Sequence, residues 1–262
     1  MMKPLPPILE TNQLSTGFFA GKQTQCISEN VNIKLHQGKL IALIGINGAG
    51  KSTLIRTLSG LQPAISGEIL LQQQSLFDYT TLDIAREISL VLTEKITFSQ
   101  ATVFDLVALG RQPYTNWMDQ LQAEDINAIN QALQLTETVE FKHKKINELS
   151  DGQLQKALIA KALAQDTALI LLDEPTSHLD LSYQVTLLKL MQKLAHVQNK
   201  SILYSTHDID SAIQMADEMI IMLKNKTIQD TPCNLIEQGV FDDLFHHSDL
   251  YFDKQKGKFV IK

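Results

Sequence analysis

The chain has 262 residues, enough for one large domain or two small ones, and 44% of them are hydrophobic. This composition supports a sizeable core and argues against global disorder. The formal net charge of −6 argues against a dedicated nucleic-acid binder, which usually carries a basic field. The two cysteines, Cys26 and Cys233, lack metal-ligand spacing, and we interpret them as free thiols in a reducing cytosol. No apolar run approaches the roughly 18 residues of a membrane helix, so we expect a soluble, cytoplasmic chain.

The first region, residues 8–40, is predicted to be rich in strands. Val31, Ile33 and Leu35 alternate with polar residues, which is the period-two pattern of a half-buried strand. The glycines and phenylalanines of residues 17–21 indicate a turn ahead of that strand.

The next stretch, Gly45 to Thr53, fits the phosphate-binding P-loop pattern G-x-x-x-x-G-K-[ST]. An apolar, strand-like run precedes it and a helix-like run follows it, as the motif requires. Glycines let backbone N–H groups close around phosphate oxygens, and the helix start adds a positive dipole end. We expect Lys51 to reach the β- and γ-phosphates and the Ser52 hydroxyl to ligate Mg²⁺. The predicted nucleotide ligands here are Gly45, Asn47, Gly48, Ala49, Gly50, Lys51, Ser52 and Thr53.

The flanks of the P-loop decide between two interpretations of it. The alternative is an ordinary glycine-rich turn beside a surface lysine, which the strand before and the helix after disfavour. Further short strands are predicted at 67–71 and 88–92. Strands alternating with helices indicate a largely parallel sheet covered by helices.

Residues 95–165 show helical patterns in place of alternating strands and helices, and they are predicted to form a helical insert in this α/β core. Thr102 and Asp105 resemble a capping box that opens a helix through Leu109. A second helix is predicted around Ile129 from apolar residues at helical spacing. Between these helices, residues 110–114 are predicted to form a turn.

The segment after the insert returns to alternating strands and helices. The apolar run 168–172 is predicted to be a buried parallel strand, and it ends in Asp173 and Glu174. Such an Asp holds Mg²⁺ in P-loop folds, and the adjacent Glu174 is placed to accept a proton from an attacking water. A solvated acidic pair at a strand end is the alternative. A helix at 182–196 and strands at 201–205 and 219–223 follow, and residues 254–258 resemble a hairpin tip.

Residues 149–153, Leu-Ser-Asp-Gly-Gln, open a predicted helix over 154–164. Ser150 and Gln153 form the pattern of a capping box. The same serine, glycine and helix start could instead offer free N–H groups and a dipole to an anion. The local pattern leaves both interpretations open.

Taken together, five ordered motifs resemble the ATP-binding cassette (ABC) ATPase family from about Phe18 to Leu223. They are the P-loop, residues 149–153, the strand with Asp173-Glu174, and the segments 177–180 and 205–208. The resemblance implies a P-loop NTPase with a RecA-like α/β core, an N-terminal antiparallel β subdomain and an inserted α-helical subdomain. The expected single ABC ATPase domain covers residues 1–262, with the core at about 1–94 and 166–262 and the helical subdomain at about 95–165.

The resemblance also implies a head-to-tail homodimer with two ATP molecules between the chains. Each site would combine one chain's P-loop with the other chain's signature residues, which are Ser150, Asp151, Gly152 and Gln153. Glu174 would be the general base, His207 would sense the γ-phosphate, and Asp180 would lie in the D-loop between the sites. Phe18 would stack on adenine, although an aromatic near a turn is more often a core residue.

Two positions in these motifs depart from the family pattern. Glu94 stands where the family carries its Q-loop glutamine, with Gln100 as the alternative. We expect Glu94 to join Ser52 and Asp173 as the ligands of Mg²⁺, the cofactor used with ATP. Asp151 replaces the commoner signature glycine and is expected to point away from the γ-phosphate.

Details such as residues 107–114 resemble the ATPases of type II importers for iron-siderophore, haem and cobalamin. That branch implies an ATPase at the cytoplasmic face of the inner (plasma) membrane, bound to an integral membrane permease dimer. A permease helix would enter the groove between core and helical insert, and an extracytoplasmic substrate-binding protein would deliver the cargo. The alternative is a non-transport ABC ATPase that acts on DNA or ribosomes. We see no coiled coil, zinc insertion or second cassette, and no nucleic acid is expected as a partner.

Overall fold

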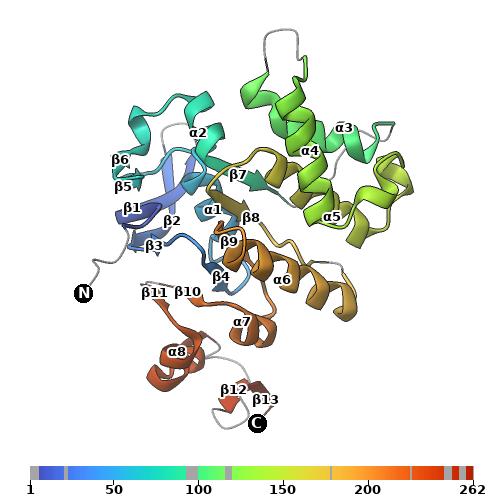
Figure 1. Cartoon of the computed structure of the whole chain (residues 1–262). Helices are drawn as coiled ribbons and strands as arrows, with labels where there is room; N and C mark the ends of the chain where they lie inside the picture. The colour runs from blue at the N-terminus through green and yellow to red at the C-terminus, as the bar shows by residue number, and fades with distance from the viewer. Residues whose placement is uncertain are drawn as a thin grey trace, which may run out of the picture.

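The computed structural model describes residues 6–20, 23–92, 100–115, 120–177, 179–224, 226–244, 250–253 and 258–261. Two larger sheets and a group of helices make up most of the described fold (Figure 1).

The central sheet has six strands in the order β11-β10-β4-β9-β8-β7. Neighbouring strands from β10 to β7 run parallel, and β11 adds an antiparallel edge. Every residue of β4, β8 and β9 is buried, as expected for parallel strands covered on both faces. The predicted, largely parallel sheet is therefore confirmed. The strands span Leu40–Gly45 (β4), Ile88–Val91 (β7), Leu169–Leu172 (β8), Ser201–Ser205 (β9), Glu218–Leu223 (β10) and Lys226–Asp230 (β11).

The second sheet is antiparallel and joins β2-β1-β5-β6, with β3 also paired to β1. Its strands are Leu9–Ala20 (β1), Gln23–Val31 (β2), Lys34–Leu35 (β3), Ser66–Leu71 (β5) and Gln74–Ser75 (β6). The turn predicted at 17–21 begins too early, because residues 17–20 still pair with β2. The ladder continues as far as the pair Ala20 and Gln23.

The strand predicted across Val31, Ile33 and Leu35 is divided in two. All three side chains are buried, as the alternation predicted. The ladder breaks between β2 and β3 because the side chain of Thr11 takes the place of a main-chain partner. The Thr11 hydroxyl donates to the Val31 carbonyl at 2.8 Å and accepts from the Ile33 N–H at 3.1 Å.

The helices packed along the sheets include four that the sequence did not reveal to us. The predicted helices after the P-loop and at 182–196 are confirmed, whereas α2, α7, α8 and α9 were missed. The helices here are Lys51–Leu58 (α1), Thr81–Glu87 (α2), Leu181–His196 (α6), Ile209–Met215 (α7), Pro232–Gln238 (α8) and Val240–Leu244 (α9), with a 3₁₀ turn at Leu76–Asp78.

A short hairpin, β12 (Leu250–Asp253) with β13 (Lys258–Ile261), packs near α9. The Phe252 ring stacks on Phe241 with centroids 4.8 Å apart. The predicted hairpin tip falls mostly on residues 254–257, outside the described part of the chain.

The remaining helices come from the segment predicted to be a helical insert, and Figure 1 shows α3, α4 and α5 gathered together. They are Val103–Ala108 (α3), Ala123–Leu135 (α4) and Asp151–Ala164 (α5), with 3₁₀ turns at Leu109–Tyr114 (η2), Val139–Phe141 (η3) and Ile146–Glu148 (η4). The capping box of Thr102 and Asp105 is confirmed. The subdomain boundaries near 94 and 166 stay a prediction.

The turn predicted at 110–114 is a 3₁₀ helix held by a buried arginine. The Arg111 guanidinium donates to Asp125 Oδ1 and to the Ala164 carbonyl, each at 2.8 Å. It also lies 4.0 Å from the centroid of the Tyr114 ring. Arg111 therefore ties this segment to α4 and to the end of α5.

We expect Arg111→Met to lower the free energy of unfolding by about 3–5 kcal/mol, because it leaves the Asp125 carboxylate buried without its cation. Denaturant unfolding at pH 7 measures this, and exposed Lys144→Met is the control, expected within about 0.5 kcal/mol of wild type.

Burial would raise the pKa of Asp125, but hydrogen bonds from Gln122 and Arg111 outweigh it and lower that pKa. The stabilisation is present above the ordinary pKa of about 3.9 and is lost as pH falls through the lowered value. An Arg111→Met chain as stable as wild type at pH 7 would contradict this.

Candidate functional site

The P-loop connects the end of β4 to the start of α1. Gly50 is the N-cap of α1 and has a left-handed backbone with φ of 96°. A Cβ on Gly50 would lie 2.6 Å from Ile27 Cγ2, so both backbone and space require glycine here. The first N–H groups of a helix have no acceptor within the helix, which leaves those of α1 available to phosphate oxygens.

A cavity of about 340 Å³ opens at this loop. Its lining comprises Phe18, Ile27, residues 47–53, Glu174 and His207. Phe18 is 48% exposed, so it is not the core residue that an aromatic near a turn usually is. The structure thus brings Phe18, the P-loop, Glu174 and His207 to one cavity.

Glu174 reaches the cavity, with Asp173 next to it in the chain, because β4, β9 and β8 are neighbours in the sheet. Ligand sites in such sheets form at the carboxyl ends of the strands. Asp173 and Glu174 follow β8, and Asp173 is only 4% exposed. Glu174 has a left-handed φ of 48°, an uncommon and strained conformation for a residue with a side chain.

Ser205, at the end of β9, links the two acidic residues. Its hydroxyl donates to Asp173 Oδ1 at 2.7 Å and accepts from the Glu174 N–H at 2.8 Å. Ser205 belongs to the motif 205–208, but no role was predicted for it. A polar residue that ends an apolar parallel strand is a signal, but its partner depends on the order of strands in the sheet.

Lys51, His207 and Glu174 converge at the same cavity. His207 Nε2 lies 2.6 Å from Glu174 Oε1 and 3.4 Å from Lys51 Nζ. Since a carboxylate only accepts hydrogen bonds, the Nε2 proton belongs to the contact with Glu174. Lys51 donates instead to the Gly45 carbonyl at 3.0 Å. Burial lowers the pKa of the Lys51 ammonium, and the charges of Glu174 and Asp173 oppose that shift.

The signature residues lie outside this cavity among the residues that the structure describes. Ser150 is the N-cap of α5, and its hydroxyl accepts from the Gln153 N–H at 3.3 Å. The capping-box interpretation is therefore confirmed, and α5 begins at Asp151 rather than Leu154. Ser150 and Asp151 are exposed at the start of this helix. The first backbone N–H groups of a helix have no acceptor within it, so the anion-binding interpretation stays a prediction. Asp180 is likewise an N-cap, of α6.

Two predicted residues bear on the metal. Glu94 lies outside the described residues, whereas Gln100 is exposed and accepts from Lys145 Nζ at 2.9 Å. In the described part of the chain, no group of three or more His, Cys, Asp or Glu side chains could form a metal cage. Mg²⁺ needs no such cage when phosphates and waters complete its shell, and it prefers oxygen ligands. The Ser52 hydroxyl and Asp173 carboxylate fit that preference.

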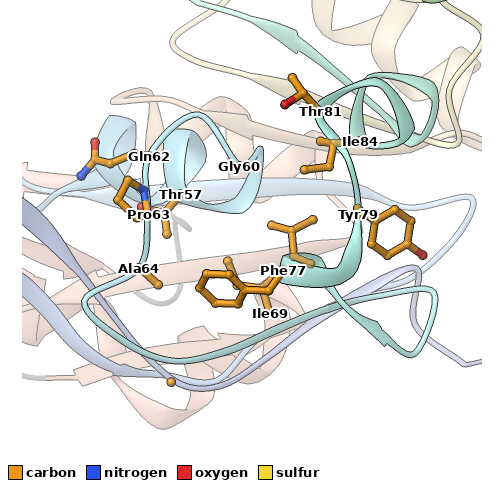
Figure 2. Close-up of a pocket in the computed structure, with 12 residues that line it drawn as sticks. Thr57, Gly60, Gln62, Pro63, Ala64, Ile69, Phe77, Tyr79, Thr81 and Ile84 are labelled. Atoms are coloured by element: carbon orange, nitrogen blue, oxygen red, sulfur yellow. The ribbon is translucent and has the colours of Figure 1, made fainter.

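A second cavity, of about 290 Å³, lies beyond the end of α1 (Figure 2). Its walls include Thr57, Ile69, Phe77, Tyr79 and Ile84, and Figure 2 shows these side chains around one hollow. Its lining residues include no Asp, Glu, Lys, Arg or His. It therefore lacks the charged groups that phosphate binding and hydrolysis require, which the P-loop cavity has in Lys51, Glu174 and His207.

Comparison with known proteins agrees with this geometry. The family model described as "ABC transporter" matches residues 28–177, more than half of the chain. The chain belongs to the ABC transporter ATP-binding family. It is an ATPase that binds ATP and hydrolyses it to drive transport, and the predicted fold class is confirmed.

Individual relatives of this ABC ATPase align over most of its length. The achromobactin transport ATP-binding protein CbrD of Dickeya dadantii is 36% identical over 86% of this chain and 84% of its own. The ferric enterobactin transport ATP-binding protein FepC of Escherichia coli is 34% identical over 90% and 86%. An inward-facing ABC transporter described as of the metal-chelate type shares 28% identity with a TM-score of 0.78, covering 97% of this chain and 95% of that one. In the described residues, no helix is long and apolar enough to cross a membrane.

We expect Ser205→Ala to lower the turnover number of this ABC ATPase about 10-fold, the equivalent of a hydrogen bond worth about 1–1.5 kcal/mol. The change frees the Asp173 carboxylate and the Glu174 backbone from a shared partner. Ser201→Ala is a matched control on the same strand, because the buried Ser201 hydroxyl has no hydrogen-bond partner among the described residues. Phosphate release at saturating ATP measures both. Equal rates for the two variants would remove Ser205 from the site.

Proposed function

We propose that this ABC ATPase powers the uptake of an iron–siderophore or related metal chelate through a separate membrane permease. The observation that carries the proposal is the identity of its relatives. Proteins named for achromobactin, petrobactin, ferric enterobactin and iron(3+)-hydroxamate transport are 34–36% identical to it over 85–90% of the chain. The metal-chelate type of the transporter of similar structure points in the same direction.

We infer that hydrolysis proceeds by in-line attack of water on the γ-phosphate. Glu174 accepts the proton of that water, and His207 holds the Glu174 carboxylate through the contact at 2.6 Å. Lys51, six per cent exposed, acts as a partly desolvated cation toward the β- and γ-phosphates, where its charge counts more than in water. Phe18, at the edge of the cavity, is placed to stack on the adenine.

Mg²⁺ fits the same proposal. Ser52 and Asp173 would hold it, with Glu94 as the third predicted ligand. Bound there, it would neutralise charge on the β- and γ-phosphates. Ser205 keeps the Asp173 carboxylate oriented from the neighbouring strand.

The proposed assembly is a head-to-tail homodimer. The Ser150 tip of α5 lies outside its own chain's cavity. It presents the N–H groups of Asp151 and Gly152 and a hydroxyl, so it can complete the cavity of a partner. ABC cassettes of the same fold have been solved as dimers. We propose that this dimer sits at the cytoplasmic face of the membrane under two permease subunits. An extracytoplasmic binding protein would deliver the cargo to those subunits.

Uptake of radiolabelled iron in a strain lacking this chain tests the cargo. We expect loss of ferric siderophore uptake, restored by the wild-type chain and not by Glu174→Gln. Uptake of haem and of cobalamin is measured in the same strain, and the chelate whose uptake is lost is the cargo. Normal uptake of all three, together with ATP hydrolysis stimulated by DNA or ribosomes, would contradict the importer and favour the non-transport alternative.

A further inference from the structure

The first turns of α5 and α6 touch through one glycine and one aromatic ring. A Cβ on Gly152 would lie 2.5 Å from Tyr183 Cδ1, 2.8 Å from Cε1 and 3.0 Å from Cγ. The ring therefore packs directly on the backbone of α5. A residue larger than glycine at position 152 would occupy the space that the ring fills. Glycine inside a helix costs about 0.5–1 kcal/mol relative to alanine, so this contact explains why a weak helix former stands here.

Tyr183 is fixed on its other side by the D-loop. Its backbone N–H donates to Asp180 Oδ1 at 2.9 Å, the N-cap bond of α6. The neighbouring Gln184 side chain donates to the Leu179 carbonyl at 3.0 Å. These bonds hold the backbone of the first turn of α6, from which the Tyr183 ring projects onto Gly152.

That loop begins at the proposed general base. The Ser177 hydroxyl donates to the Glu174 carbonyl at 2.9 Å. Glu174 lines the chain's own cavity, whereas Ser150, two residues before Gly152, lies outside it. Tyr183 is therefore the side chain that joins the segment leaving one site to the tip offered to the other.

We propose that Tyr183 is a positioning residue, whose ring on Gly152 holds the first turn of α5 where Ser150 can complete the partner's site. This inference rests on the two-chain site proposed above. Tyr183 touches neither phosphate nor water in this scheme; it acts through Gly152. A substitution of Tyr183 should leave the P-loop cavity of the same chain unchanged, because Tyr183 does not line that cavity.

The test compares dimer formation with ATP binding in a hydrolysis-deficient background. We expect Glu174→Gln/Tyr183→Ala to dimerise with ATP at least about 10-fold more weakly than Glu174→Gln, as expected for loss of about 1.4 kcal/mol. ATP affinity of the isolated chain should change less than about two-fold. Tyr183→Phe, which keeps the ring, should dimerise like the parent. A loss of fold would lower both quantities, so the split between them identifies positioning. Should Tyr183→Ala not fold, Tyr183→Leu replaces it.

A double-mutant cycle tests the contact itself. Gly152→Ala alone should weaken the ATP-dependent dimer, because its methyl group displaces the ring. In the presence of Tyr183→Ala that methyl group meets no ring, so Gly152→Ala should then cost less than it does alone, and the loss that remains is its effect as a signature residue. Strictly additive losses would overturn the role of Tyr183. Equal dimerisation with and without the ring would overturn it as well, while absence of ATP-dependent dimers in the Glu174→Gln parent would contradict the two-chain site and the inference together.

Discussion

Replacing Glu174 by glutamine should lower the turnover number by about 10²- to 10⁴-fold, the range for a positioned general base. The substitution removes a proton acceptor but keeps the size of the side chain. It also keeps an oxygen that can accept the hydrogen bond from His207, now 2.6 Å from the carboxylate. ATP affinity should therefore stay close to that of wild type. Single-turnover hydrolysis and equilibrium ATP binding measure the two effects separately.

The control for this substitution is Glu140→Gln, an exposed position within the 3₁₀ turn η3 and outside the P-loop cavity. It should hydrolyse ATP at the wild-type rate. If Glu174→Gln also did so, Glu174 would not be the base.

Replacing Lys51 by methionine should lower the turnover number by about 10²- to 10³-fold, comparable to the loss of one preorganised charge-stabilising group. Methionine fills much of the space of a side chain that is only 6% exposed, so the change tests the charge rather than the packing. ATP affinity should fall as well, because the ammonium contacts the phosphates before and during reaction. Phosphate release and calorimetric ATP binding measure the two losses.

Lys39→Met is the matched control for Lys51→Met. Lys39 precedes β4, whereas the P-loop follows it, so it stands at the other end of the same strand. It should keep wild-type turnover. Wild-type hydrolysis by Lys51→Met would show that the P-loop does not hold the phosphates in the way proposed.

The strands of the parallel sheet were readable from sequence because burial on both faces makes them continuous apolar runs. β4, β8 and β9 were all predicted to within about one residue. Helix α2 escaped although Thr80 and Asp83 form the same capping box as Thr102 and Asp105. It has seven residues and none of them is buried, so it shows no apolar periodicity.

The C-terminal helices were missed for a different reason. Helix α8 carries a start signal, Thr231 as N-cap with Pro232 in its first turn, and a stop signal, Gly239 with φ of 72°. These signals were present in the sequence but too local to indicate which face is buried. The packing of Phe241 on Phe252, which closes this end, depends on a contact between separate elements.

The candidate site also contains residues that local sequence patterns reveal and residues that they do not. Lys51, Asp173, Glu174 and His207 belong to motifs with fixed spacing, and their types alone indicate phosphate chemistry. Ser205 and Tyr183 act across elements: one bridges β9 to the end of β8, the other packs α6 on α5. Such roles require the strand order and the helix packing, which no local pattern in the sequence specifies.

The central claim is that two copies of this chain enclose ATP, each with its P-loop and the other's Ser150 tip. Its most direct test is the molar mass of the Glu174→Gln chain by light scattering, with and without Mg²⁺-ATP. We expect one chain of 29.3 kDa without the nucleotide and twice that mass with it, and no doubling when Ser150→Arg is added. A Glu174→Gln chain that binds ATP and stays at the mass of one chain would contradict the account.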